Sequence, residues 1–145
     1  AYPAYSPYHW LVRHAALVSP LVVLTLLMSC REPPRPAPET IAVIRSLGTF
    51  SGRGSQTIGV VSESGHLRIS WQTRNEQPAG TGTFRLALHS GVSGRPIELI
   101  TDQRGEVQGT RDVTDDPRPY NLMVDAQNLD WTFTVEEIVS AKVQP

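Results

Sequence analysis

The chain has 145 residues, enough for one domain with appended segments rather than for two domains. It carries 13 basic and 14 acidic side chains, so it lacks the basic excess with which a protein binds a polyanion such as nucleic acid. Its single cysteine excludes an intramolecular disulfide and a zinc site built from several cysteines.

An uncharged apolar stretch, AALVSPLVVLTLLM, covers residues 15–28. A helix that spans a bilayer needs about 20 such residues, whereas the apolar core of a secretory signal is shorter. Arg13 precedes the stretch, and Pro20 weakens a helix from inside. The pattern therefore predicts a signal peptide over residues 1–29.

The end of this stretch, Leu27-Met28-Ser29-Cys30, resembles the lipobox of bacterial lipoproteins. The resemblance implies that the thiol of Cys30 receives a diacylglyceryl group and that the chain is cut between Ser29 and Cys30. Several acyl chains on one residue give a stable membrane anchor, which one chain does not. The alternative is an uncleaved N-terminal transmembrane helix in a subunit of a membrane complex.

The segments on either side of this signal have unusual compositions. Residues 1–11 are rich in Tyr and Pro, and the compact signal V-R-H-A-A-L begins only at Val12, so our hypothesis is that residues 1–11 are not part of the native protein. Four prolines follow Cys30 within REPPRPAPET. Such a segment favours polyproline II, so we expect residues 30–40 to be a semi-rigid tether that begins at the lipidated cysteine.

Residues 41–145 have the sequence pattern of an all-β domain: short segments in which apolar and polar residues alternate are separated by Gly, Asn, Asp and Pro. This pattern predicts an antiparallel β-sandwich, jelly-roll-like, of about eight strands. The expected strands lie near 41–50, 56–62, 66–73, 82–90, 96–101, 105–113, 119–126 and 129–138.

Two hairpins follow from matching the apolar residues of consecutive strands. A loop over 74–81 would place Trp71, Ile69 and Leu67 opposite Phe84, Leu86 and Leu88. A turn at Gln127-Asn128 would place Tyr120, Leu122 and Val124 opposite Val135, Phe133 and Trp131. These residues are predicted to form the core. With Trp71, Phe84, Trp131 and Phe133 in the apolar phase of their strands, only Trp10 and Tyr120 remain as aromatic candidates for stacking on a sugar.

The first hairpin would also bring His66 opposite His89 on the outer face of the sheet. Two imidazoles about 5 Å apart can share Zn²⁺ or Cu²⁺, but no third ligand is evident, so no metal or other cofactor is predicted. Asp112, Asp115 and Asp116 could offer oxygens to Ca²⁺. Their spacing does not match an EF-hand loop, and a polar turn is the expected structure.

No motif of a catalytic site is found in the sequence. It has no G-x-S-x-G, no H-E-x-x-H and no thiol besides Cys30. The glycine-rich segments 50–55, 78–82 and 90–94 are expected to be turns that need positive φ, because no helix follows them to complete a phosphate site. The protein is therefore not expected to be an enzyme.

The mature part resembles small secreted bacterial β-sandwich domains of unassigned function. The resemblance is carried by Phe50 to Ser55, Trp71, Tyr120 to Val124 and Trp131 to Glu137. It implies the fold and no activity. The first functional hypothesis is a non-catalytic binding or envelope-assembly module. It would be anchored to a membrane through lipidated Cys30, on the side that faces the periplasm or the cell surface, with an envelope protein as a possible partner. A metal-binding or hydrolytic lipoprotein that uses His66 and His89 is the other hypothesis.

Overall fold

The computed structural model describes residues 32–143, which form an all-β domain preceded by a short extended segment. Eight strands follow one another along the chain: β1 (Glu39–Arg53), β2 (Gln56–Ser62), β3 (His66–Arg74), β4 (Thr83–Ser90), β5 (Pro96–Arg104), β6 (Gln108–Thr114), β7 (Arg118–Gln127) and β8 (Asp130–Val143). The sequence predicted all eight, with the largest differences at β1 and β8, which are longer than expected. The compact unit begins at Pro38, three residues before the predicted domain start.

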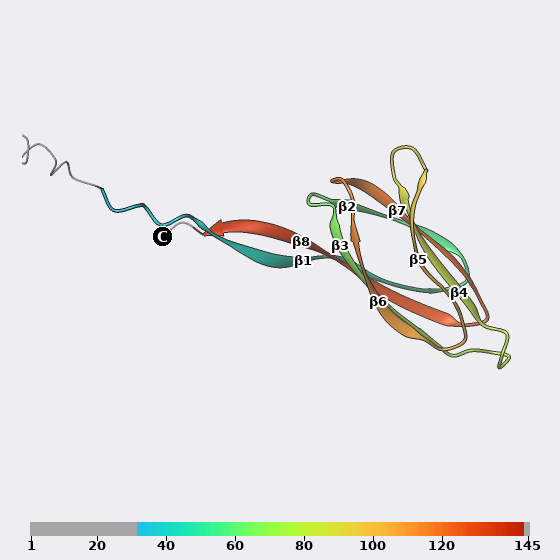
Figure 1. The fold of residues 1–145 in the computed structure, drawn as a ribbon. Helices are drawn as coiled ribbons and strands as arrows, with labels where there is room; N and C mark the ends of the chain where they lie inside the picture. Colours follow the sequence, from blue (N-terminus) through green and yellow to red (C-terminus); the bar gives the residue numbers. More distant parts are fainter. Residues whose placement is uncertain (1–31, 144–145) are drawn as a thin grey trace, which may run out of the picture. The chain divides into compact units, whose positions relative to one another are not determined.

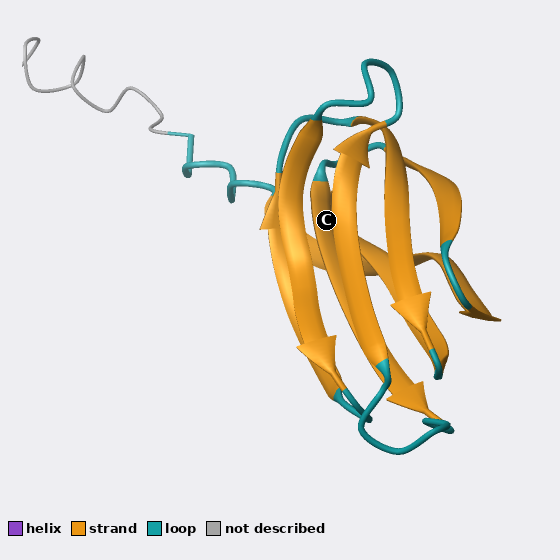
Figure 2. Cartoon of the chain, turned by 90° about the vertical axis from the view of Figure 1, so that its right-hand side faces the viewer, coloured by secondary structure: helices purple, strands orange, loops and turns teal. Residues whose placement is uncertain are grey.

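The strands form two antiparallel four-stranded sheets packed face to face (Figures 1 and 2). Sheet A has the order β1-β8-β3-β6, and sheet B has the order β2-β7-β4-β5. This arrangement of eight strands in two sheets is a jelly roll. The predicted fold class is confirmed.

The core lies between the sheets and is built by alternate residues of each strand. Trp131, Phe133 and Val135 of β8 face Phe84, Leu86 and Leu88 of β4 and their neighbours on β7. All of these side chains are almost fully buried. The prediction that these aromatic residues belong to the core is confirmed, and Trp71 also packs against it, although it is only partly buried.

Both predicted hairpins are wrong. Strand β3 pairs with β6 and β8, whereas β4 pairs with β5 and β7. Strands β7 and β8 likewise lie in different sheets. The segments 75–82 and 128–129 therefore carry the chain from one sheet to the other. The apolar residues that were matched do face one interior, but from opposite sheets and not from neighbouring strands.

Tyr120 closes the sandwich at the start of β7 and is fully buried. Its hydroxyl donates to the backbone carbonyl of Asp116 and to the carboxylate of Asp115 (3.1 Å). A buried tyrosine that bonds backbone a few residues upstream is the tyrosine corner of Greek-key sandwiches. Burial, with the Asp115 carboxylate, raises the pKa of Tyr120 to about 12. The burial of Tyr120 agrees with its predicted place among the inward residues, and it removes Tyr120 as a candidate for stacking on a sugar.

Candidate binding face

The outer face of sheet A carries a block of uncharged polar side chains. Two rows cross all four strands at right angles to the chain direction, and each row takes one residue from each strand. The first row is Thr49, Thr134, Ser70 and Thr110, and the second is Ser51, Thr132, Gln72 and Gln108. We call these eight residues the neutral face.

Hydrogen bonds between neighbouring strands hold the hydroxyl groups of the neutral face in position. The hydroxyls of Thr49 and Thr134 are 2.9 Å apart, and those of Ser70 and Thr110 are 3.0 Å apart. Each such hydroxyl has one proton and two lone pairs, so one bond leaves it capacity for a ligand. The neutral face therefore presents ordered donors and acceptors on a rigid sheet.

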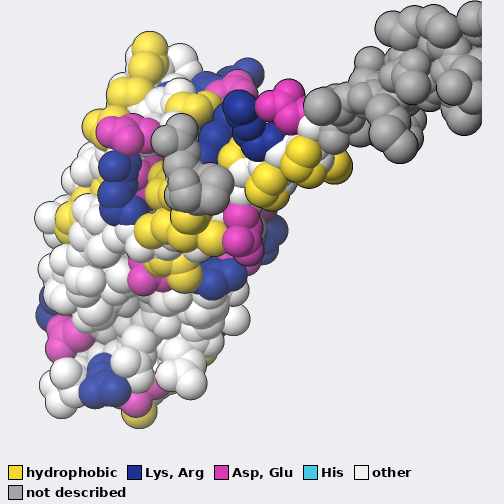
Figure 3. Space-filling model, turned by 90° about the vertical axis from the view of Figure 1, so that its left-hand side faces the viewer, with side chains coloured by type: hydrophobic (Ala, Val, Ile, Leu, Met, Phe, Trp, Pro, Cys, Tyr) yellow, Lys and Arg dark blue, Asp and Glu magenta, His cyan; other side chains and the backbone are white. Residues whose placement is uncertain are grey.

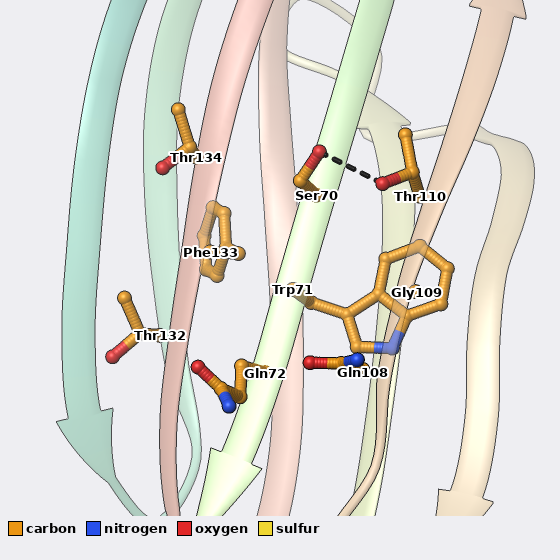
Figure 4. A pocket seen from close by; sticks show the side chains of 9 residues that line it. All are labelled: Ser70, Trp71, Gln72, Gln108, Gly109, Thr110, Thr132, Phe133 and Thr134. Atoms are coloured by element: carbon orange, nitrogen blue, oxygen red, sulfur yellow. Dashed lines mark hydrogen bonds between the residues drawn. The ribbon is translucent and has the colours of Figure 1, made fainter.

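The neutral face is slightly hollowed along β3, where a shallow depression of about 500 Å³ lies between β8 and β6 (Figure 4). Its polar lining comes from Ser70, Gln72, Gln108, Thr110, Thr132 and Thr134. Gln72 and Gln108 are partners in the register of β3 and β6, and Figure 4 shows their amides on either side of β3 at one end of the depression. An amide offers a donor and an acceptor together, which suits a ligand that has both.

Next to β6, Trp71 and Gly109 line the floor of the depression, and they are partners in the register of β3 and β6. The indole of Trp71 passes under Gly109, where an added Cβ would lie only 2.4 Å from the ring. The indole Nε1 is buried and lacks a hydrogen-bond partner within the described part of the chain. Gly109 is therefore required for Trp71 to pack beneath this edge strand.

Charged side chains bound the neutral face at both ends, and several of them form ion pairs. At one end Arg68 donates two hydrogen bonds to Asp112, at 2.8 and 2.9 Å, and this guanidinium lowers the pKa of the Asp112 carboxyl. At the other end Asp130 accepts from Asn75 and Arg53, and these hydrogen bonds lower its pKa. Arg74 and Glu136 lie in the same two rows, opposite Asp130 and Arg68. The eight residues between these charged rows carry no charge.

His66 and His89 do not lie opposite each other, as the first hairpin required. His66 is on β3 of sheet A next to Thr114, and His89 is on β4 of sheet B next to Asn121. Among residues 32–143 no group of three or more His, Cys, Asp or Glu side chains could hold a metal ion.

The three aspartates near β6 and β7 pair with arginines. Asp112 binds Arg68, as described above, whereas Asp115 and Asp116 both contact Arg118, at 3.2 and 3.0 Å. Asp115 and Asp116 lie in the short polar connection between β6 and β7, as predicted, whereas Asp112 lies within β6 itself. Positive φ angles also occur in the three glycine-rich segments, at Gly54, Gly80 and Gly94.

A buried carboxylate that the sequence reading missed is Glu137 of β8, which is fully inaccessible to solvent. Its Oε2 accepts from the hydroxyl of Ser62 (2.7 Å) and from the backbone N–H groups of Glu63 and Ser64, and its Oε1 accepts from Nε of Arg45 (2.6 Å). Burial alone would raise the pKa of Glu137, but these hydrogen bonds outweigh it and lower the pKa to about 2. The sequence does contain a signal for this burial. Glu137 follows Trp131, Phe133 and Val135 at every second position of the strand, so it shares their inward face.

Cys30, with Ser29 before it, lies outside the described residues, as does the rest of the predicted signal peptide. Within residues 32–143 no helix has the length and apolar character that crossing a membrane requires.

No protein-family model and no curated protein matches the chain. Among solved structures it is similar to the N-terminal CBM22-1 and GH10 modules of endo-1,4-β-D-xylanase 10B from Clostridium thermocellum, in complex with xylohexaose. The match has a TM-score of 0.36 and 11% sequence identity, and it covers 72% of this chain and 27% of that chain. The chain thus spans about a quarter of that structure, and the fold assignment rests on the strand order given above.

Proposed function

We propose that the protein is a non-catalytic binding module, held on the extracytoplasmic side of a membrane by lipid on Cys30. The sequence supports the anchor through the lipobox-like Leu27-Met28-Ser29-Cys30 and the tether that follows it. The neutral face is the observation that carries the binding role. Eight uncharged hydrogen-bonding residues on four neighbouring strands, bounded at both ends by charged residues, form a surface suited to recognition rather than to bond cleavage.

The ligand chemistry follows from what the neutral face offers. Hydroxyl and amide groups bind hydroxyl and amide groups, and the lack of net charge gives no advantage to an ionic ligand. Strands about 4.8 Å apart make each four-residue row about 14 Å long, the length of a few linked sugar units. The preferred ligand is therefore an uncharged polymer rich in hydroxyl and amide groups.

The binding role can be tested with two probes that share a backbone and differ in charge: an N-acetylglucosamine hexamer, which is neutral, and the fully deacetylated hexamer, which is cationic. A fragment of residues 32–145 contains the whole core and suits an NMR titration. We expect the neutral probe to shift the backbone signals of β8, β3 and β6 around the neutral face. Shifts confined to other surfaces, or an equal response to the cationic probe, would overturn this role.

Variants sharpen the same test. Thr132→Val and Thr110→Val remove a hydroxyl from the neutral face at nearly constant shape, whereas Thr57→Val makes the same change on β2 of sheet B. Each of the first two should weaken binding of the neutral hexamer by about five- to tenfold, the effect of one lost hydrogen bond. The control Thr57→Val should bind like the unmodified fragment.

The anchor is tested separately in bacterial cells that process lipoproteins. Cys30→Ala should abolish incorporation of labelled palmitate and leave the chain unprocessed, because no other thiol can accept the lipid. Ser29→Ala keeps a small residue before the cleavage point and should be processed normally. Retention of the full mass by the unmodified chain would instead support an uncleaved transmembrane helix.

A further inference from the structure

The first part of β1 and the last part of β8 form a two-stranded ribbon outside the sandwich. Strand β3 pairs with β8 only as far as Glu137, so beyond this point β8 pairs with β1 alone. We define the ribbon as residues 39–45 and 137–143. Figure 1 shows it running out past the other strands.

One face of the ribbon is apolar and lacks a covering sheet. It continues the inner face of sheet A, and its aliphatic residues are Ile41, Val43, Val139, Ala141 and Val143. Ile41, Val43 and Val143 are 43%, 40% and 44% exposed, in contrast to the buried inward residues of the sandwich. Figure 3 shows apolar side chains gathered at this end of the domain. Proteins seldom leave such a surface uncovered.

The outer edge of β1 is also unprotected in the ribbon. Beyond Glu39, residues 40–44 read TIAVI, without a charge, proline or bulge. Two other sheet edges have the usual protection against pairing: β5 has Pro96 and two register shifts, and β6 has Arg111 and Asp112. In β2 the inward residues Ile58, Val60 and Ser62 are already buried in the sandwich. The other free edge of the ribbon, β8 beyond Glu137, carries Lys142. Within the described domain, the β1 edge of the ribbon is therefore the charge-free edge whose inward aliphatic side chains are exposed.

The free edge decides which kind of partner fits. A lipid bilayer could cover the apolar side chains but would leave the N–H and C=O groups of the ribbon edges without hydrogen bonds, which is costly in hydrocarbon. A partner that brings its own β-strand satisfies the edge and shields the side chains together. The occupant must therefore be a protein strand with an apolar pattern.

We propose that this strand is the ribbon of a second copy of the chain, joined antiparallel through β1 about a two-fold axis at Ala42. The pairing places Ile41 beside the partner subunit's Val43, and Glu39 beside the partner subunit's Arg45. Parallel pairing in register would instead place like charges opposite each other, which is unfavourable. The register shift between Ser46 and Gly48 ends the regular edge, so the pairing covers residues 39–45.

The association is independent of the lipid anchor and of the neutral face. Seven residues per copy bury much less than the ~800 Å² per partner of a standard stable interface, so the dimer is weak in solution. Disulfide trapping detects weak pairing, and the fragment of residues 32–145 has no cysteine. If one cysteine is introduced, any disulfide-linked dimer must therefore join that position in two copies.

The trapping experiment compares Ala42→Cys with Ser140→Cys in a glutathione redox buffer. The two residues are neighbours on the same face of the ribbon, and both are exposed. At the two-fold axis, position 42 of one copy would lie opposite position 42 of the other, at the Cα separation of about 5 Å that a disulfide needs, so Ala42→Cys can be cross-linked. Position 140 is one strand farther from the axis in each copy, so the thiols of Ser140→Cys would be too far apart. We expect dimer from Ala42→Cys to form at least ten times faster.

A second variant tests the edge itself. Val43→Lys places a charge in the pairing segment and should slow trapping of Ala42→Cys about tenfold, whereas the control Val61→Lys, at a 63% exposed position of the edge strand β2, should not. Tryptophan fluorescence verifies that every variant is folded. Equal trapping rates for Ala42→Cys and Ser140→Cys indicate random collision and overturn the proposal, as does binding of a monomeric fragment to phosphatidylcholine–phosphatidylglycerol vesicles.

Discussion

At the scale of single residues, Glu137 connects three parts of the chain. It joins the end of the buried part of β8 to Arg45 on β1 and to the turn between β2 and β3. A carboxylate without solvent contact is tolerated only when its lone pairs are satisfied, and here five donors from Arg45, Ser62, Glu63 and Ser64 point at it. This residue therefore holds the β2–β3 turn against sheet A.

Replacing Glu137 by Gln should lower the free energy of unfolding by about 3 kcal/mol, because it removes the charge that the buried donors were arranged to meet. Glu136→Gln is the matched control, since Glu136 is the neighbouring residue on the outer face. Urea denaturation of both variants measures the difference. Equal unfolding free energies would show that Glu137 is no more important than a surface carboxylate.

Glu137 also predicts how stability depends on pH. Its pKa of about 2 in the folded protein is below the ordinary 4.5, so the unfolded chain binds this proton more readily. The stability that Glu137 contributes is complete above the ordinary pKa and is lost as the pH falls from there towards 2. Denaturation at several pH values should give a steeper acid loss in the unmodified protein than in Glu137→Gln.

At the scale of elements, the positions of strands were predictable and their pairing was not. Alternation of apolar residues located all eight strands and assigned residues such as Ile69, Phe84 and Phe133 to the interior. The same alternation results whether consecutive strands form a hairpin or cross between sheets, because inward residues meet inward residues in both arrangements. The order of strands, and with it the separation of His66 from His89, depends on long-range packing.

The neutral face also depends on the order of the strands and could not be predicted from the sequence. Thr132 and Thr134, Ser70 and Gln72, and Gln108 and Thr110 each occupy outward positions that look like ordinary solvated residues in the sequence. Only the placing of β8 between β1 and β3 makes them neighbours.

The edge strand β6 provides a test at this scale. Gly109→Ala would put a methyl group 2.4 Å from the Trp71 ring, so the indole must move, and we expect a loss of about 1–3 kcal/mol in unfolding free energy. Gly59→Ala on the edge strand β2 meets no atom closer than 3.7 Å and should change stability by less than about 0.5 kcal/mol. Thermal denaturation followed by tryptophan fluorescence compares the two, and similar losses would contradict the close packing of Trp71.

At the scale of the whole molecule, one core joins both sheets. Its residues run from Ile58 to Val135 and include side chains from every strand except β1, whose Leu47 and Phe50 pack against it. Residues 38–145 also form one compact unit. Among the described residues, the tether contributes no side chain to this core.

We therefore expect the fragment of residues 32–145 to unfold in a single cooperative transition. Far-ultraviolet circular dichroism, which reports the sheets, and tryptophan fluorescence, which reports Trp71 and Trp131, should give the same midpoint in urea. Separate midpoints would mean that the two sheets, or the ribbon and the sandwich, unfold independently.

The place of β8 in sheet A has a consequence for how the chain is made. Strand β8 is the last to be synthesised, yet it lies between β1 and β3 and supplies Trp131, Phe133 and Val135 to the core. A nascent chain that ends before β8 leaves β1 without any neighbour in its sheet. Sheet B and the β3–β6 pair contain no residue of β8, but the sandwich cannot close before β8 has emerged. With this strand order, the core of the domain is completed only after the eighth strand has been made.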